Sequence, residues 1–342
     1  MDSTNIIYDF EPLWDTWRSS DLLGLGSTSR VYKISRREFG KEFTSALKLI
    51  TIPSDIHILE LKKSNSNNSL EYKIDYIHNL VRNIINEITL LYELKGHSNI
   101  ISYEDHMIKK ISDDNWLIFI KMELATPLNI YFSENKFTVR KTIKLGIDMC
   151  SALETSHFRN IIHGDIRESN IFVSKNETFK LGNFNVSNDK NTPDYVQKKI
   201  GTLNYVPPEI IAGSKYTYLS DIYTLGIVLY KLLNNGKFPM NDTPITCENY
   251  FKKLSNAKFK PPINSFKELS EILSKACSFN PNDRYQKAEE FKDDLIKLTQ
   301  INKKSKGVLS KTLENNLNDI KDLNDENDNK SFTWRGVVYK KH

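Results

Sequence analysis

The sequence predicts an α+β fold in which a mostly antiparallel sheet with one main helix precedes a mainly helical part. Strand-like runs dominate the first 125 residues, and one long amphipathic helix pattern interrupts them. Helix patterns then follow one another over most of the remaining chain. With 342 residues the chain can form one large domain, and the change of character near residue 125 predicts a bilobal architecture.

The predicted sheet begins with a hairpin whose turn contains glycines. Gly24 and Gly26 follow a strand-like segment, and residues 31–34 read as the returning strand. A further strand over residues 45–50 is expected to end at Pro53. These runs predict the first strands of the sheet.

One long helix is predicted before the next pair of strands. Residues 62–69 are rich in Asn and Ser and read as a loop. Residues 72–94 then read as a helix, and strand-like runs follow around 100–108 and 116–122. The apolar residues at helical spacing are Ile77, Leu80, Ile84, Ile88 and Leu91.

The second part of the chain is predicted to be mainly helical. The pattern over residues 219–233 is so strongly apolar that it predicts a buried helix. The other predicted helices cover residues 138–160, 246–255, 266–277 and 286–299.

The two ends of the chain are expected to lie outside the main domain. We place this domain at residues 18–300, with an N-terminal lobe over 18–125 and a C-terminal lobe over 126–300. Residues 1–17 read as a short leader. Residues 301–342 form a charged, Asn-rich tail that ends in a strand-like segment.

Composition argues against several classes of protein. Hydrophobic residues make up 39% and charged residues 27%, which is typical of a globular chain in water. The net charge of +5 is small, and no run of Lys and Arg interleaved with aromatic residues indicates nucleic-acid binding. No apolar run has membrane-spanning length, and the N-terminus lacks the basic and apolar blocks of a signal peptide. The three cysteines lack metal-ligand spacing and read as free thiols in a reducing compartment. Together these observations predict a cytoplasmic protein without a membrane partner.

The glycine turn and the next strand contain a candidate phosphate-binding set. Glycines between two strands let backbone N–H groups approach and hold phosphates. Lys48 follows on a strand and can reach the same phosphates, and Glu87 in the long helix can hold its ammonium group. Ser29 stands where a third glycine is typical. Taken singly, these features also fit a plain hairpin and a solvated helix charge, so the prediction depends on their combination.

The strongest local signal is the segment 163–170, which reads His-Gly-Asp-Ile-Arg-Glu-Ser-Asn. Asp165 precedes Asn170 by five positions, in a loop between a predicted helix and the strand-like residues 171–173. A carboxylate can accept a hydroxyl proton, and an amide oxygen can bind Mg²⁺. The segment therefore predicts a general base close to a metal ligand.

Four further motifs follow in order along the chain. They are Lys-Leu-Gly-Asn-Phe-Asn at 180–185, Gly-Thr-Leu-Asn-Tyr-Val-Pro-Pro-Glu at 201–209, Ser-Asp-Ile-Tyr-Thr-Leu-Gly at 220–226 and Asn-Pro-Asn-Asp-Arg-Tyr at 280–285. The order and spacing of all these motifs resemble the eukaryotic-type protein kinases, closest to the Ser/Thr class, over most of the chain. The resemblance implies the bilobal kinase fold, ATP with Mg²⁺ or Mn²⁺ as cofactors, and a protein substrate or regulated partner protein. It implies no nucleic acid beyond the nucleotide.

The resemblance assigns nucleotide-binding roles residue by residue. The glycine loop would cover the phosphates, Lys48 would hold them while paired to Glu87, and Met122 would be the gatekeeper. The remaining residues expected around ATP are Leu23, Gly24, Gly26, Ser29, Val31 and Ala46, the hinge residues Glu123, Leu124 and Ala125, and Phe172 beneath the adenine.

The resemblance also assigns the reacting groups. Asp165 would be the catalytic base, and Arg167 would contact the γ-phosphate. Asn170 and Asn183 would be the metal ligands. Two structural sets are implied as well: a packed column of Leu91, His163 and Phe184, and a buried ion pair of Glu209 with Arg284.

The sequence departs from the family pattern at several positions. Asn183 replaces the metal-binding Asp, so an oxygen donor remains but its charge is lost. Asn185 replaces the next Gly, and Gly164 replaces the Arg that binds a phosphorylated activation segment. Arg167 replaces a Lys and keeps the positive charge. We therefore expect weakened metal binding and turnover.

Three functions compete at this point. The first is ATP-dependent transfer of the γ-phosphate to Ser/Thr hydroxyls, which Lys48, Glu87, Asp165 and Asn170 favour. The second is a pseudokinase that acts as a nucleotide-binding or scaffolding regulator, which Asn183, Gly164 and Ser29 favour. The third is a small-molecule phosphotransferase, which the segments 201–209 and 280–285 argue against.

Overall fold

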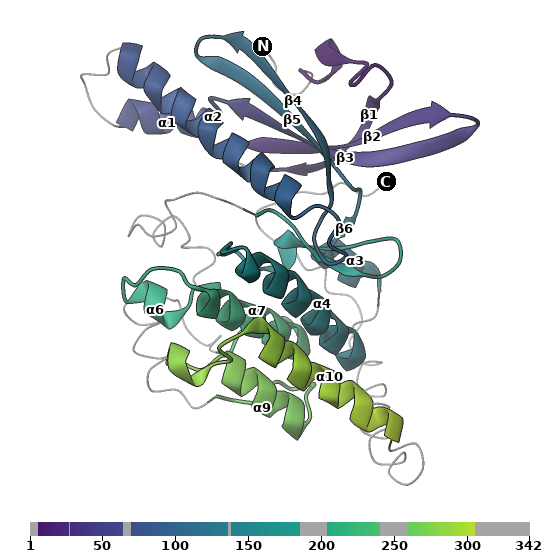
Figure 1. Ribbon diagram of the computed structural model, residues 1–342, viewed down its shortest axis with the longest axis vertical. Helices are drawn as coiled ribbons and strands as arrows, with labels where there is room; N and C mark the ends of the chain where they lie inside the picture. Colours follow the sequence, from purple (N-terminus) through teal and green to yellow (C-terminus); the bar gives the residue numbers. More distant parts are fainter. Residues whose placement is uncertain are drawn as a thin grey trace. The chain divides into compact units, whose positions relative to one another are not determined.

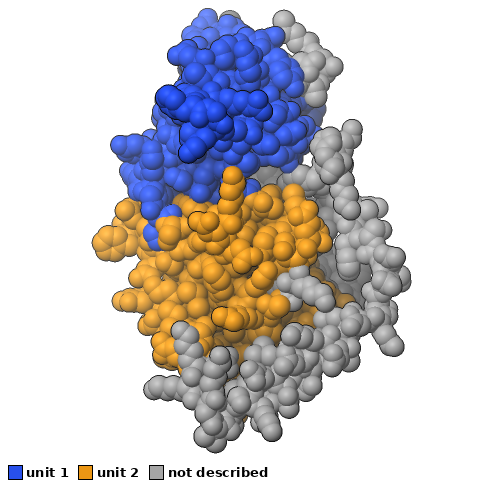
Figure 2. All heavy atoms as spheres, turned by 90° about the vertical axis from the view of Figure 1, so that its right-hand side faces the viewer, with its two compact units in different colours: residues 1–97, 101–125, 331–342 blue, residues 98–100, 126–330 orange. Residues whose placement is uncertain are grey.

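The computed structural model describes residues 6–26, 28–63, 70–135, 138–184, 204–239 and 259–304. The chain divides into two compact units, which Figure 2 colours separately. Within the described residues, the first unit holds the chain up to His97 together with 101–125. The second holds 98–100 and the chain from Thr126 onward.

The first unit is built on a five-stranded antiparallel sheet (Figure 1). The strand order β1-β2-β3-β5-β4 follows from hairpins that join strands adjacent in sequence, with β5 returning beside β3. The strands are β1 (Arg18–Leu25), β2 (Ser29–Glu38), β3 (Lys41–Ile52), β4 (Tyr103–Ser112) and β5 (Asn115–Met122).

One face of this sheet is covered by the N-terminal segment of the chain. Because side chains alternate along a strand, Tyr32 and Leu47 point to the face opposite from Val31 and Lys48. Ile7, Leu13 and Trp17 pack on this face, and Lys121 Nζ lies 4.0 Å from the centre of the Trp17 ring. The described part of the expected leader, which includes a short 3-10 helix at Tyr8–Phe10, is thus part of the hydrophobic core.

Two helices of the first unit follow β3. The predicted long helix is present as α2 (Leu70–Glu93). A shorter helix, α1 (Asp55–Lys63), precedes it and was not predicted from the sequence. Three of its four apolar residues, Ile56, Ile58 and Leu59, are exposed, so no buried stripe marks this helix in the sequence.

The second unit is a group of helices with a small three-stranded sheet. Helix α7 (Tyr218–Leu233) is buried along almost its whole length, which explains why its sequence is apolar on every side. It packs against α4 and α9, and α10 packs against the same two helices (Figure 1). The other elements are β6 (Thr126–Pro127), α3 (Leu128–Glu134), α4 (Val139–Phe158), a 3-10 turn at Glu168–Asn170, β7 (Ile171–Val173), β8 (Phe179–Leu181), α6 (Pro208–Ile211), α9 (Lys267–Ala276), a 3-10 turn at Pro281–Asp283 and α10 (Ala288–Lys304).

The predicted α+β class is confirmed: a sheet unit with one main helix precedes a mainly helical unit. The helices expected at 138–160, 219–233, 266–277 and 286–299 are present within a few residues of their predicted bounds. The helix expected at 246–255 and the strand-like end of the tail lie outside the described residues.

Candidate active site

Strand register in the first unit gathers the predicted nucleotide-binding residues on one face of the sheet. Gly24 pairs with Val31, and Val31 pairs with Lys48 on the next strand. Ala46 lies two residues from Lys48 and pairs with Met122 on β5. Paired residues, and residues two apart on one strand, share a face.

The glycine turn is closed by a backbone hydrogen bond. Gly26 N–H donates to the carbonyl oxygen of Ser29 at 2.7 Å. A Cβ at position 26 would lie 3.0 Å from Ser29 Oγ and 3.3 Å from the Ser29 carbonyl oxygen, so the turn has little room for a side chain there. Leu23 is half-buried near the end of β1.

The predicted contact between Lys48 and Glu87 is present. Lys48 Nζ lies 2.7 Å from Glu87 Oε1, and the two side chains are 17% and 10% exposed. Glu87 belongs to the buried stripe of α2, beside Ile88 and four residues before Leu91. A carboxylate on a buried helix face is costly without a cation, so the ion pair explains why an acidic residue stands there.

The expected hinge residues lie at the end of β5. Glu123 N–H donates to the Ser102 carbonyl oxygen at 3.0 Å, and Ser102 N–H donates to Glu123 Oε1 at 2.7 Å. The Glu123 side chain therefore holds its own backbone in place. Leu124 and Ala125 are half-buried and lie outside regular strands.

In the second unit, a buried carboxylate holds the loop that carries Asp165. Asp221, on α7, accepts hydrogen bonds from His163 N–H at 2.9 Å and Gly164 N–H at 2.8 Å, and lies 2.9 Å from His157 Nε2. Burial alone would raise the pKa of Asp221, but the hydrogen bond and charge of His157, the charge of His163 and the Gly164 N–H hold it below its usual value. Gly164 has a φ of +67°, a conformation that favours glycine.

Asp165, Asn170 and Asn183 form a ladder of hydrogen bonds. Asn170 Nδ2 donates to Asp165 Oδ2 at 2.9 Å and to the Asp165 carbonyl oxygen at 2.7 Å. Asn183 Nδ2 donates to Asn170 Oδ1 at 2.9 Å. Arg167 Nε lies 3.5 Å from Asp165 Oδ2. The structure thus brings together the four polar residues that the sequence predicts for this loop.

Aromatic and strand contacts lie next to the loop that carries Asp165. The rings of His163 and Phe184 meet edge to face with centres 4.8 Å apart, and His163 Nε2 lies 3.0 Å from the Gly182 carbonyl oxygen. Phe172 is half-buried on β7, where it pairs with Lys180 and Pro127. Leu91, the third member of the expected column, is buried in the first unit.

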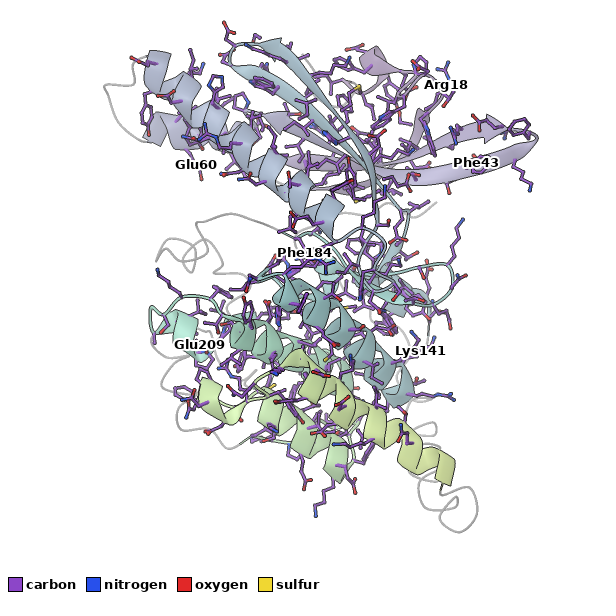
Figure 3. The ribbon with its side chains drawn as sticks, viewed as in Figure 1. Arg18, Phe43, Glu60, Lys141, Phe184 and Glu209 are labelled. Carbon is purple, nitrogen blue, oxygen red and sulfur yellow. The ribbon has the colours of Figure 1, made fainter. Side chains whose placement is uncertain are left out.

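The predicted ion pair of Glu209 with Arg284 is present and bidentate. Arg284 Nη1 donates to Glu209 Oε1 at 2.9 Å, and Nη2 donates to Oε2 at 2.7 Å. The Arg284 side chain is completely buried, and Glu209 lies on α6 (Figure 3). The pair anchors α6 to the turn before α10.

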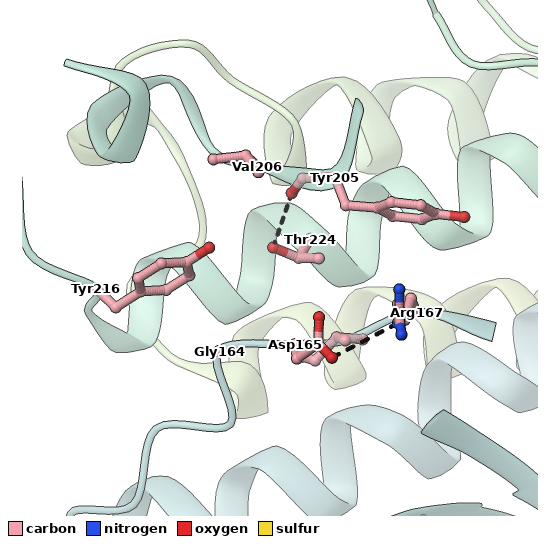
Figure 4. Close-up of a pocket in the computed structure, with 8 residues that line it drawn as sticks. Gly164, Asp165, Arg167, Tyr205, Val206, Tyr216 and Thr224 are labelled. Carbon is pink, nitrogen blue, oxygen red and sulfur yellow. Dashed lines mark hydrogen bonds and ion pairs between the residues drawn. The ribbon is translucent and has the colours of Figure 1, made fainter. Parts of the chain in front are cut away.

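Sequence reasoning missed a pocket next to Asp165. Figure 4 shows Asp165 and Arg167 on the loop and Thr224 on α7, with Tyr205 and Tyr216 beside them. Thr224 Oγ1 donates to the Tyr205 carbonyl oxygen at 3.4 Å. Gly164, Ile166 and Val206 complete the lining. Tyr205 and Val206 belong to the motif at 201–209, but nothing in that motif indicates that they line a pocket beside Asp165.

A buried charged cluster borders this pocket and was also missed. Lys231 Nζ lies 2.8 Å from Glu168 Oε1 and donates to Tyr205 Oη at 2.7 Å. Tyr205 Oη in turn donates to Glu168 Oε2 at 2.5 Å. Burial raises the pKa of Tyr205, and the neighbouring Glu168 raises it further, so the phenol remains a hydrogen-bond donor. The available signal was Lys231 itself, a lysine between apolar residues in the second half of α7.

A family model for the protein kinase domain matches residues 17–296. The chain belongs to the protein kinase family. Asn185 and residues 201–203, which begin the motif that ends at Glu209, lie outside the described residues.

Relatives of known name agree with this family. A probable serine/threonine-protein kinase of Clostridium perfringens is 30% identical over 226 residues, which cover 64% of this chain and 32% of the relative. Serine/threonine-protein kinase PknB of Mycolicibacterium smegmatis is 30% identical over 53% of this chain and 30% of its own length. A probable serine/threonine-protein kinase of Dictyostelium discoideum is 29% identical over 58% of this chain and 47% of its own. The chain thus matches a third to a half of the length of these relatives.

Protein kinases use ATP and a divalent metal, and the residues expected to bind the metal are Asn170 and Asn183. Asn170 and Asn183 offer amide oxygens, which suit a hard cation but lack charge. Among the described residues, no three His, Cys, Asp or Glu side chains gather in a way that could hold a metal ion. The donor set therefore fits a divalent cation only as a weak site. Across the same residues, no helix has the length and apolar character needed to cross a membrane.

Proposed function

We propose that this chain is an ATP-dependent serine/threonine protein kinase located in the cytoplasm. The observation that carries the proposal is the hydrogen-bonded set of Asp165 and Asn170 in a chain that belongs to the protein kinase family. The names of its relatives favour transfer to Ser or Thr over a purely regulatory role.

The proposed roles follow from the chemistry of each side chain. The Lys48 ammonium group, held by Glu87, binds the α- and β-phosphates of ATP. The glycine turn with Gly24, Gly26 and Ser29 is proposed to cover the phosphates. In the first unit, the groups proposed to bind the adenine are the side chains of Leu23, Val31, Ala46 and the gatekeeper Met122 and the backbone of Glu123, Leu124 and Ala125. In the second unit, Phe172 is proposed to contact the adenine.

Asp165 is proposed as the general base for the substrate hydroxyl. Its Oδ2 accepts a hydrogen bond from Asn170 Nδ2 and lies 3.5 Å from Arg167 Nε, and these two contacts fix the orientation of the carboxylate. Arg167 balances negative charge on the transferred phosphate. The Asn170 and Asn183 oxygens would hold Mg²⁺ or Mn²⁺, which neutralises charge on the phosphates when bound.

The pocket lined by Tyr205, Val206 and Tyr216 is proposed to receive the protein substrate. It shares Asp165 and Arg167 with the proposed reacting groups, so a peptide seated there presents a hydroxyl next to the base. The Glu209–Arg284 pair is proposed to have a structural role, because each charged group binds the other and is not available to a substrate.

The test is phosphate transfer from ATP labelled at the γ position. We expect the purified protein, with Mg²⁺ or Mn²⁺, to label itself or a generic basic protein on Ser and Thr, as phosphoamino-acid analysis would show. Asp165→Asn serves as the background control. Label found on Tyr alone, or equal label with the control, would contradict the proposal.

A further inference from the structure

Asn183 stands where the family pattern has a metal-binding Asp, and its amide makes a hydrogen bond within the proposed site. Its Nδ2 donates to Asn170 Oδ1 at 2.9 Å, and Asn170 Nδ2 donates to Asp165 Oδ2 at 2.9 Å. Each amide thus presents its positive end to the next oxygen of the ladder. The ladder is complete with protein atoms alone.

A carboxylate at position 183 could not make the first of these bonds. It would present two acceptor oxygens to Asn170 Oδ1, which is also an acceptor, and the contact would be repulsive. A cation between the two oxygens would relieve this repulsion. The amide avoids the repulsion without changing the shape of the side chain.

The net formal charge of the four side chains Asp165, Arg167, Asn170 and Asn183 also bears on the binding of an anionic nucleotide. Asp165 and Arg167 cancel, and Asn170 and Asn183 are neutral, so the four side chains carry no net formal charge. The triphosphate of ATP is strongly anionic. A neutral set does not repel it, whereas one extra carboxylate would.

We infer that this chain binds ATP without a divalent cation, because the Asn183 amide closes the Asp165–Asn170 ladder and adds no negative charge. The inference rests on the proposed function in one respect, namely that ATP is the nucleotide bound. It concerns binding only; transfer of the phosphate still benefits from a cation that neutralises the transition state.

Asn183→Asp changes the charge at this position while preserving the backbone conformation and the size of the side chain. Asn183 has a φ of +58°, a left-handed conformation that Asn and Asp both tolerate better than most residues. Its side chain is exposed, so Asn183→Asp buries no new charge. Asn282→Asp is a matched control, because Asn282 is also exposed and lies in the turn Pro281–Asp283, which supplies no residue of the proposed site.

The experiment is calorimetric titration of the full chain with ATP, once with Mg²⁺ and once with EDTA. For the natural chain and for Asn282→Asp, we expect the two dissociation constants to agree within about threefold. For Asn183→Asp, we expect ATP to bind at least about tenfold more weakly in EDTA than in Mg²⁺, because the added carboxylate repels the uncompensated phosphates.

Two outcomes would overturn the inference while leaving the proposed function intact. One is a natural chain that loses ATP binding in EDTA. The other is an Asn183→Asp chain that keeps the metal-independence of the natural chain. Failure of ATP to bind under either condition would instead overturn the proposed function, and this inference with it.

Discussion

At the scale of single residues, Asp221 shows how one buried carboxylate holds the backbone of the loop proposed to carry the catalytic base. It accepts two backbone N–H groups of the loop and lies next to His157. These interactions outweigh the cost of burial and lower its pKa. Because the loop ends in Asp165 and Asn170, the position of both proposed functional groups depends on this residue.

Replacing Asp221 with Asn should destabilise the protein by about 3 kcal/mol at neutral pH, because hydrogen bonds to an ionised buried group are lost. Since the folded-state pKa is depressed, the stability supplied by Asp221 is present above its usual pKa of 3.8 and is lost as the pH falls through the folded-state value. Chemical unfolding at several pH values should show the gap between Asp221→Asn and the natural chain closing below about pH 4. A gap that stays constant into strong acid would contradict this account.

Residue types could predict part of the site but not its hydrogen bonding. Lys48 and Glu87 could be paired from the sequence, because a lysine that follows a glycine turn needs a carboxylate to hold it and Glu87 lies beside the apolar face of the long helix. Asp165 and Asn170 could be paired from their spacing within one loop. The direction of the Asn183 amide could not, because the sequence records which group is present and not which atom it turns to a neighbour.

At the scale of elements, close packing around α7 explains two glycines inside helices. A Cβ at Gly226 would lie 2.7 Å from Cys277 Sγ and 3.0 Å from Ala276 Cβ, atoms that cannot retreat without moving α9. A Cβ at Gly146 on α4 would lie 2.7 Å from Leu295 Cδ1 and 3.0 Å from Leu229 Cδ1, which are the flexible ends of leucines. The neighbours of Gly146 can therefore move aside for an added methyl group more easily than the neighbours of Gly226.

Gly226→Ala should destabilise the protein by about 1–2 kcal/mol, because overpacking outweighs the gain in helix propensity. Gly146→Ala should be close to neutral, because the leucine ends can turn aside while the helix gains the same propensity. Melting temperatures measured by calorimetry would rank the two variants. A larger loss for Gly146→Ala than for Gly226→Ala would show that this description of the packing is wrong.

Long periodic elements could be predicted from the sequence, whereas short ones could not. Helices α2, α4 and α7 have clear apolar patterns over many turns, and each lies within a few residues of its predicted bounds. Helix α1 was missed because most of its apolar residues are exposed, and α6 was missed because it has only four residues. The core role of Trp17 was missed because its partners come from strands distant in sequence.

At the scale of the whole molecule, the proposed roles divide between two units that each have a core of their own. The first unit supplies Lys48 with Glu87, together with the glycine turn. The second supplies Asp165, Asn170 and Asn183, together with the pocket at Tyr205. Family membership could be predicted because motifs from both units occur in one fixed order along the chain.

The most direct test of the central claim is the rate of phosphate transfer to a protein substrate by the natural chain and by Asp165→Asn. If Asp165 is the general base, the substitution should lower kcat/KM by about 10²–10⁴-fold. Binding of ATP should change little, because the Lys48–Glu87 pair and the glycine turn are untouched. Equal rates for the two proteins would contradict the account, since the transfer would then not depend on the carboxylate at the centre of the site.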